Sequence, residues 1–542
     1  MKLSTLKSAG KFSVLVLTLI ISAMLLVGCG GDDKKEQAEN AAPAAPEKIV
    51  LKLAMDADPV SLDPQVQLSG GMMQYSHIVF DPLVRWTKDG GFEPRLAESW
   101  ETIGDTVTRF HLRKDVKFHS GNPFTAQDVV FTLNRLKQSD DFKGLFTAFD
   151  DAVAVDDHTV DLVTFEPYGL VMAMATYIFP MDKDFYSGID PKNDKPKDLI
   201  LKTDYTFANY NESGTGAFAV TAREQGVKTT FTRFADYWDK NTGNVDEIVL
   251  TPIGEAPTRV AALLSGDVDF IMPVPPNDLE RIGSTDGLKL VTMSGSRIIT
   301  FQLNQKRLAE FANPKVRLAM AYAYDNNGVA KKIMKGFATV AGQNSPLGYQ
   351  GHNPALTPRF DLEKAKALMI EAGYPNGFSC TMIAPNNRYV NDEKIAQAFV
   401  AMMSKIGITV SLKTMPKAQY WDQFDAQVAD IQMIGWHSDT EDSANFFEYL
   451  DMCPNKDTGK GQYNSGNYCN AEVDKLTMAS NVETDLEKRK AILQKVEQIM
   501  YDEAAFIPLH WQNLSWASKN NMNTEDIVNV MNFPFFNDLV IK

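Results

Sequence analysis

The pattern of apolar and polar residues in the C-terminal third predicts three helices that alternate with strands. Gly373 and Pro375 stop the first helix, and Gly407 supplies the left-handed stop of the second. The order β-α-β-α-β predicts a mostly parallel sheet with right-handed crossovers. The expected helices are 361–372, 391–406 and 417–427, and the expected strands are 378–384, 408–412 and 431–436.

The middle of the chain has an α+β pattern. Short strand-like runs alternate at Phe110/Leu112 and at Val116/Phe118, and a helix with a capping-box start follows at Thr125. Further on, a strand at 248–253, a helix at 256–265 and a strand at 268–272 predict a βαβ unit. The chain is therefore expected to have an α/β fold.

Length and composition restrict the class of protein. The chain has 542 residues, of which 44% are apolar, so it can bury a large core divided among about three domains. The formal net charge of −15 opposes binding to a phosphate backbone, so nucleic acid is not an expected partner.

The N-terminus predicts export and lipidation. Three lysines precede an uncharged stretch, 12–27, whose sixteen residues span about 24 Å as a helix, less than the hydrocarbon core of a bilayer. Residues 1–28 are therefore expected to be a signal peptide and not a permanent membrane helix. Leu26-Val27-Gly28-Cys29 resembles the bacterial lipobox, which implies lipidation of Cys29. The polar, Ala/Pro-bearing run 29–47 is expected to be a flexible tether.

Three cysteines remain after the leader is removed. Cys453 and Cys469 flank a Gly- and Asn-rich loop, and we expect them to form a disulfide in an oxidising compartment. Cys380 lies in a strand-like run and is expected to be a small core residue and not a nucleophile.

Two opposite charges follow two of the predicted parallel strands. Arg388 and Asp439 should emerge at the same sheet edge, where ligands bind in such folds. Together they could hold the two ends of a zwitterion, or they could form a mutual salt bridge or remain solvated. Trp436, at a strand end, could cover a ligand or belong to the core.

The sequence contains none of the common catalytic motifs that were considered. It contains no Gly-x-Ser-x-Gly, no phosphate-binding Gly-rich loop, no His-Glu-x-x-His and no Cys-x-x-Cys, which leaves a secreted hydrolase as a weak alternative. No cofactor and no metal site are expected. His437 is the exception among the scattered histidines, because beside Asp439 it could help to bind a metal chelate.

The chain resembles the extracytoplasmic solute-binding proteins of ABC importers, family 5 (the dipeptide/oligopeptide/nickel class). The resemblance covers nearly all of the chain after residue 48 and implies a two-lobed periplasmic-binding-protein fold with an extra α+β domain. The segments that carry it are Arg95–Glu101, Phe110–Val130, Gly214–Phe218, Asp246–Ile248, Val316–Asp325 and Asp361–Pro375.

The resemblance also implies roles for individual residues. In peptide-binding members, a Gly-Trp-x-x-Asp segment holds the ligand's α-ammonium, and here this segment is Gly435–Asp439. Asp439 would bind the ammonium, and the backbone of Gly435 and His437 would pair with the peptide main chain. Asn387-Arg388-Tyr389 occupies the place from which an arginine meets the ligand carboxylate.

The sequence departs from the family pattern after Asp439, where Thr440-Glu-Asp442-Ser443 replaces Tyr-x-Asp-Pro. Glu441 and Asp442 could favour a second cation on the ligand, but we expect Asp442 and Ser443 to cap the next helix. The same fold also carries opines, nickel complexes, haem and oligosaccharides, so a non-peptide solute remains the alternative ligand.

The expected protein is a lipid-anchored, extracytoplasmic, monomeric receptor that delivers short peptides to an ABC permease. Residues 48–80, 205–295 and 505–542 would form one lobe, 81–204 an accessory domain and 296–504 the other lobe. Two crossovers between the lobes imply a hinge that closes on the ligand.

Overall fold

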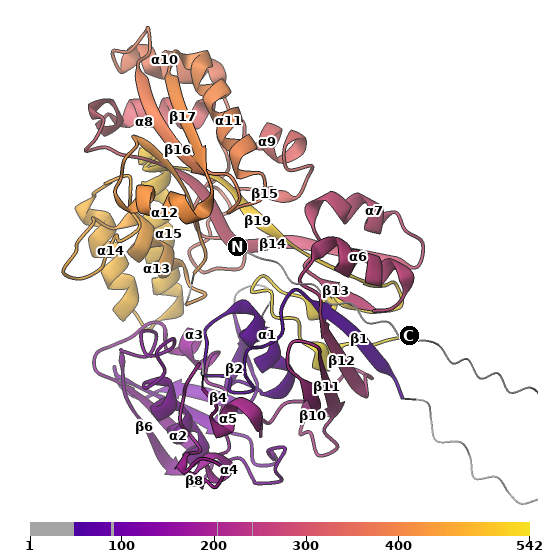
Figure 1. Cartoon of the computed structure of the whole chain (residues 1–542). Helices are drawn as coiled ribbons and strands as arrows, with labels where there is room; N and C mark the ends of the chain where they lie inside the picture. Colours follow the sequence, from indigo (N-terminus) through magenta and orange to yellow (C-terminus); the bar gives the residue numbers. More distant parts are fainter. Residues whose placement is uncertain (1–47, 88–90, 203, 241, 439) are drawn as a thin grey trace, which may run out of the picture. The chain divides into compact units, whose positions relative to one another are not determined.

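Eleven strands of the protein join in one mixed sheet (Figure 1). The computed structural model describes residues 48–87, 91–202, 204–240, 242–438 and 440–542, so the leader, Cys29, the tether and Asp439 lie outside the described residues. The order along the sheet is β10-β11-β12-β1-β13-β19-β14-β18-β16-β17, and β15 pairs with β19. Within the described ranges, no helix has the length and apolar character needed to cross a membrane.

One half of the sheet contains the predicted βαβ unit. β1 (Val50–Met55) lies between β12 (Glu247–Pro252) and β13 (Phe270–Met272) and is parallel to both. α6 (Ala256–Ser265) connects β12 to β13 and ends at Gly266, whose φ of 81° places it in the left-handed region that favours glycine. This prediction is confirmed. The antiparallel strands β10 (Phe218–Glu224) and β11 (Lys228–Arg233) extend this half to its edge.

The other half contains the alternation predicted for the C-terminal third. β16 (Ser379–Pro385) pairs in parallel with both β17 (Thr409–Met415) and β18 (Ile431–Trp436). The helices α10 (Leu362–Glu371), α11 (Asp392–Met403) and α12 (Lys417–Asp425) precede these strands in the chain. Asp361 caps α10 by accepting a hydrogen bond of 2.9 Å from the backbone N–H of Lys364. The parallel arrangement is therefore confirmed.

Two long strands that the sequence pattern did not predict join the two halves. β14 (Leu288–Leu303) pairs antiparallel with β19 (Phe506–Lys519) along most of its length, and β14 also pairs antiparallel with β18. One end of the β14–β19 pair lies beside β13, whereas the other end lies beside β18 and β15 (Ala338–Val340). In Figure 1 the pair runs between the indigo and magenta strands and the orange strands.

A separate four-stranded sheet lies within 81–204, with the order β4-β5-β7-β6. Its strands are β4 (Ala97–Thr102), β5 (Val107–Leu112), β6 (Phe149–Asp156) and β7 (Thr159–Thr164). α2 (Ala126–Leu136) begins with the predicted capping box, in which the N–H of Thr125 donates to Asp128 at 2.8 Å. The prediction of a strand at Val116/Phe118 is wrong. Only an isolated β-bridge between Lys117 and Pro123 forms there, because the chain turns tightly at Gly121.

Buried apolar side chains of the described residues gather into separate clusters. The largest draws on 51–186, 208–272 and 516–539, and the next two draw mainly on 298–511. The exact domain boundaries stay a prediction. Cys453 and Cys469 are joined by a disulfide with a Cα–Cα distance of 4.5 Å, and Cys380 is a buried free thiol whose pKa is raised to about 12 by burial.

Candidate functional site

A cavity of about 630 Å³ lies where the ends of β16 and β18 meet the β14–β19 pair. Its size falls in the range that holds small-molecule ligands. The wall comes from segments distant in sequence, which are 68–73, Tyr177, 295–297, Arg388, Trp421, 434–438, Glu441, Tyr463, 512–514 and 530–533. Four of the six predicted ligand-binding residues, Arg388, Gly435, Trp436 and His437, line it, as the rule for parallel strand ends leads one to expect.

Arg388 is positioned by the first turn of α11. The carboxylate of Asp392 accepts hydrogen bonds from the backbone N–H groups of Arg388 and Tyr389, at 2.8 and 2.9 Å. The Arg388 guanidinium carbon lies 4.9 Å from the centroid of the Tyr389 ring. Within the described part of the chain, no carboxylate pairs with this guanidinium. A fixed cation in the cavity wall is therefore available to a ligand carboxylate.

Tyr389 lies behind the wall and does not line the cavity. Its side chain is buried, and its hydroxyl accepts a hydrogen bond of 2.7 Å from the backbone N–H of Gly435. A Cβ at Gly435 would approach Tyr389 to 2.7 Å and Ile299 to 2.5 Å, which explains why glycine occupies this position. The structure therefore gives Tyr389 a supporting position behind the wall, and a contact between Tyr389 and a ligand stays a prediction. The Gly435 N–H is therefore already engaged within the protein.

Trp436 is anchored by neighbouring aromatic and polar groups. Its indole N–H donates to Asn445 Oδ1 at 2.8 Å, and its ring lies 4.7 Å from the centroid of Tyr463 and 5.1 Å from that of Tyr449. Trp436 and Tyr463 both line the cavity. The tryptophan is therefore both part of a packed aromatic cluster and a preorganised apolar surface for a ligand.

His437 is a neutral member of the wall. Its Nε2 lies 3.5 Å from Glu441 Oε1, and 32% of its side-chain surface is exposed. Burial and, second, the positive charge of Arg297 lower the pKa of His437 to about 4. At neutral pH the imidazole therefore offers a hydrogen-bond donor and an acceptor without charge.

Hydrogen bonds hold the segment 440–444 in position. Ser438 Oγ accepts a 2.9 Å hydrogen bond from the Asp442 N–H, and Asp442 accepts one of 2.8 Å from the Ala444 N–H as the N-cap of α13 (Ser443–Phe446). The predicted capping role of Asp442 is confirmed. Asp442 also forms a two-pronged ion pair with Arg489, at 2.6 and 2.8 Å.

Glu441, which the sequence analysis considered beside the site, lines the cavity, and so does Arg297, which the sequence analysis did not place there. The Glu441 side chain is only 1% exposed and accepts a hydrogen bond from the Tyr349 hydroxyl. Arg297 follows Gly295 inside β14, and a glycine followed by a charge within an apolar run is a sequence signal of a β-bulge. This signal could have identified Arg297.

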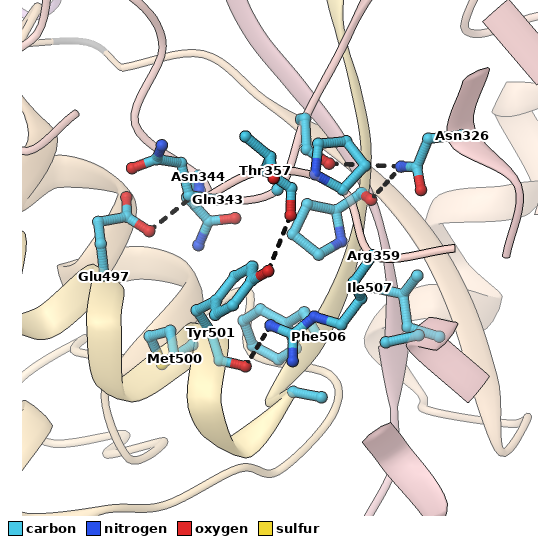
Figure 2. A pocket seen from close by; sticks show the side chains of 16 residues that line it. Asn326, Gln343, Asn344, Thr357, Arg359, Glu497, Met500, Tyr501, Phe506 and Ile507 are labelled. Atoms are coloured by element: carbon cyan, nitrogen blue, oxygen red, sulfur yellow. Dashed lines mark hydrogen bonds between the residues drawn. The ribbon is translucent and has the colours of Figure 1, made fainter. Parts of the chain in front are cut away.

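A second, smaller cavity lies between α15 (Leu486–Glu503), the start of β19 and the loops at 341–344 and 357–359 (Figure 2). Its volume is about 30 Å³, which is room for about two water molecules. Two hydrogen bonds join the elements around this cavity. The Tyr501 hydroxyl donates to the Thr357 carbonyl at 2.9 Å, and Arg359 donates to the Tyr501 carbonyl at 2.6 Å. It is too small to hold a peptide-sized solute.

Comparison with known proteins identifies the family to which this protein belongs. The family model of bacterial extracellular solute-binding proteins, family 5 Middle, matches residues 91–458. The chain belongs to this family of extracytoplasmic binding proteins, which confirms the predicted family, two-lobed fold class and receptor role.

Individual relatives cover almost the whole chain. Heme-binding protein A of Haemophilus influenzae is 27% identical over 533 residues, 91% of this chain and 93% of the relative. The dipeptide-binding protein of Escherichia coli is 27% identical over 487 residues, 84% and 88% of the two chains. The structure of the ABC transporter-associated periplasmic binding protein DppA from Helicobacter pylori in complex with the peptide STSA superimposes with a TM-score of 0.67 at 25% identity, covering 91% and 98%.

Proposed function

We propose that the protein is the lipid-anchored receptor of an ABC importer and captures short peptides in the 630 Å³ cavity. The observation that carries this proposal is the Arg388 guanidinium, which faces the cavity without a carboxylate partner in the described part of the wall. A free peptide supplies the missing carboxylate at its C-terminus. Relatives that bind dipeptides and oligopeptides support this assignment.

The other end of the peptide would meet Asp439. This residue lies outside the described residues, so its role rests on the Gly435–Asp439 segment and on its place three residues after the end of β18. A carboxylate there would bind the α-ammonium of the peptide through charge-assisted hydrogen bonds. Cys29, the lipid anchor, and the tether 29–47 would keep this receptor at the membrane, near the permease that takes over the ligand.

The strand pair β14–β19 supplies a hinge for capture. Both strands take part in both halves of the sheet, and the cavity wall includes residues from both strands. A ligand that contacts both lobes would stabilise the arrangement in which the lobes close around it.

A metal chelate or haem is the second candidate ligand. The neutral imidazole of His437 in the wall favours it, because an uncharged imidazole is a good metal ligand, and one relative is named for haem binding.

The test is thermal unfolding and calorimetric titration with di- and tripeptides in free, N-acetylated and C-amidated forms, alongside haem and a nickel–histidine complex. A free peptide at 100 times its Kd should add about 2.7 kcal/mol to the free energy of unfolding. Blocking either end should abolish most of this gain. Arg388→Gln should remove the discrimination against amides, and Asp439→Asn the discrimination against N-acetylated peptides. Equal affinity for free and blocked peptides, or a response to haem or nickel only, would contradict peptide capture.

A further inference from the structure

A third cavity, of about 440 Å³, shares no lining residue with the two cavities described above. Its wall comes from α4 (Lys183–Tyr186), the end of α5 (Phe207–Tyr210) and the residues after it, the edge strand β10 and the loop after β1. The labels α4, α5 and β10 mark its place in Figure 1. Its volume falls in the range that holds small-molecule ligands.

One part of this wall is a preorganised aromatic surface. Tyr210 lines the cavity and is 55% exposed, and its ring stacks on that of Tyr205 with centroids 5.0 Å apart and ring planes 20° apart. Tyr205 does not line the cavity, so it supports the Tyr210 ring from outside. Phe185 and Leu62 add further apolar surface to the wall. A ring that a neighbour already orients can bind an apolar ligand face with little loss of side-chain entropy.

Two amide side chains of the wall each carry an unused acceptor. The Asn211 amide nitrogen donates to the Phe207 carbonyl at 2.8 Å, and that of Gln225 donates to the Val60 carbonyl at 3.1 Å. A carbonyl can only accept, so these bonds fix which end of each amide is the NH₂ group. Among the described residues, neither amide oxygen has a hydrogen-bond partner.

The charged groups of the wall are already paired. Arg223 donates through Nη2 to Asp58 at 3.3 Å, and its Nη1 has no hydrogen-bond partner in the described part of the chain. Glu212 accepts hydrogen bonds from two backbone N–H groups and lies 2.9 Å from Nδ1 of His119. Nε2 of His119 lies 2.9 Å from a backbone carbonyl oxygen, and because both of its partners only accept, the ring is the doubly protonated imidazolium.

These features define the chemistry of a ligand. It needs an apolar face for Tyr210, donors for two amide oxygens, an acceptor for Arg223 and no net charge. A sugar ring meets these conditions, because its C–H face is apolar and each hydroxyl both donates and accepts. A free peptide fits less well, because its two terminal charges would lose hydration beside charges that are already paired.

We infer that this cavity is a second ligand site and binds a neutral saccharide, with Tyr210 against a sugar ring and the free polar atoms of Asn211, Gln225 and Arg223 bound to its hydroxyls. The inference does not depend on the proposed capture of peptides, because the two cavities have separate walls.

Calorimetric titration and ligand-observed NMR of the purified protein test the inference with maltotriose, cellotriose and chitotriose. At least one of these neutral saccharides should bind with a Kd of about 1 mM or lower. Adenosine is included because it is also flat and uncharged, and the tripeptide Ala-Ala-Ala is included because it reports on the 630 Å³ cavity.

Variants locate the binding of the saccharide. Tyr210→Ala should weaken it at least about tenfold, because the apolar face for the sugar is lost, and Tyr210→Phe should retain most of it. Gln225→Ala should weaken it about two- to tenfold through the loss of one hydrogen bond. Phe165→Ala is the matched control, since Phe165 is 65% exposed and lines none of the three cavities. Circular dichroism verifies that each variant is folded.

The outcomes separate this inference from the proposed function. If none of the three saccharides binds, or if adenosine alone binds through Tyr210, the assignment of a saccharide is wrong. Saccharide binding that Arg388→Gln weakens and Tyr210→Ala leaves unchanged would place the sugar in the 630 Å³ cavity and overturn the inference as well. Tyr210-dependent saccharide binding without any peptide binding would support the inference while the proposed function fails.

Discussion

Single side chains determine the geometry of the cavity wall. Asp392 holds the backbone of the loop that carries Arg388, and the Tyr389 hydroxyl holds the N–H of Gly435. Neither Asp392 nor Tyr389 lines the cavity, yet each positions a residue that does. At this scale, the site depends on buried hydrogen bonds whose loss leaves a polar group without a partner.

Tyr389→Phe should destabilise the protein and weaken ligand binding. The change removes the acceptor of the buried Gly435 N–H, which should cost about 1–3 kcal/mol of the free energy of unfolding. Denaturant unfolding and calorimetric titration measure the two effects. Tyr210→Phe is the control, because the Tyr210 side chain is 55% exposed. If both variants behave like the wild type, the hydrogen bond to Gly435 does not support the wall.

The helix α15 links the cavity wall to the interior of its lobe. Arg489, near its start, pairs with Asp442 directly after the wall segment. Two turns further on, Glu497 accepts a hydrogen bond of 3.2 Å from the backbone N–H of Asn344 (Figure 2). It also accepts one of 2.6 Å from the backbone N–H of Ser345. Asn344 in turn donates to buried Asp451 at 2.9 Å. One helix therefore holds two loops through buried carboxylates.

Buried Glu497 makes stability depend on pH in a predictable direction. Burial raises its pKa from 4.5 to about 7, so the folded state takes up a proton near neutrality that the unfolded state does not. Its contribution is therefore fully present below pH 4.5 and is lost as the pH rises through 7. Between pH 8 and pH 6.5, the wild type should gain about 1 kcal/mol of unfolding free energy relative to Glu497→Gln.

Paired denaturant unfolding of the two proteins at each pH measures this difference. Histidines with lowered pKa values, such as His77 and His510, change the unfolding free energy with pH in the opposite direction. Both proteins contain them, so their contributions cancel in the difference between the two proteins. A difference in unfolding free energy that does not change with pH would show that Glu497 stays ionised in the fold.

At the scale of the whole molecule, the segments 81–204 and 296–504 make a close backbone contact with each other. The N–H of Gly169 donates to the carbonyl of Asn481, near the end of α14 (Ala471–Val482), at 2.6 Å. A Cβ at Gly169 would lie 2.4 Å from the Glu483 carbonyl oxygen and 2.8 Å from Arg489 Nε. Arg489 binds Asp442, so this contact adjoins the segment that forms the cavity wall.

Gly169→Ala should separate this contact and weaken ligand binding several-fold, because the added methyl group overlaps backbone atoms that cannot move aside cheaply. Hydrogen exchange should become faster in 165–172 and 478–490. Gly144→Ala in the same region is the matched control, since its Cβ would meet nothing within 4 Å. Unchanged exchange and affinity in Gly169→Ala would show that the contact does not stabilise the ligand-binding arrangement.

The sequence by itself determined the elements whose signals are local. Apolar periodicity with Gly373 and Gly407 as stops located the helices between the parallel strands. The parallel order of β16 and β18 brought Arg388 and Trp436 to one edge, and the motifs around them indicated the family. These features depend on neighbours within a few turns of the chain or on a family pattern.

Only the tertiary structure decided which residues complete the cavity. The register of β14 against β19 places Arg297 in the cavity wall, and the burial of Tyr389 places it behind this wall. Glu441 enters the wall because residues distant in sequence, such as Tyr349, close around it. Pairing register and burial arise from contacts between segments that are distant in sequence, and local patterns do not encode which of these segments meet.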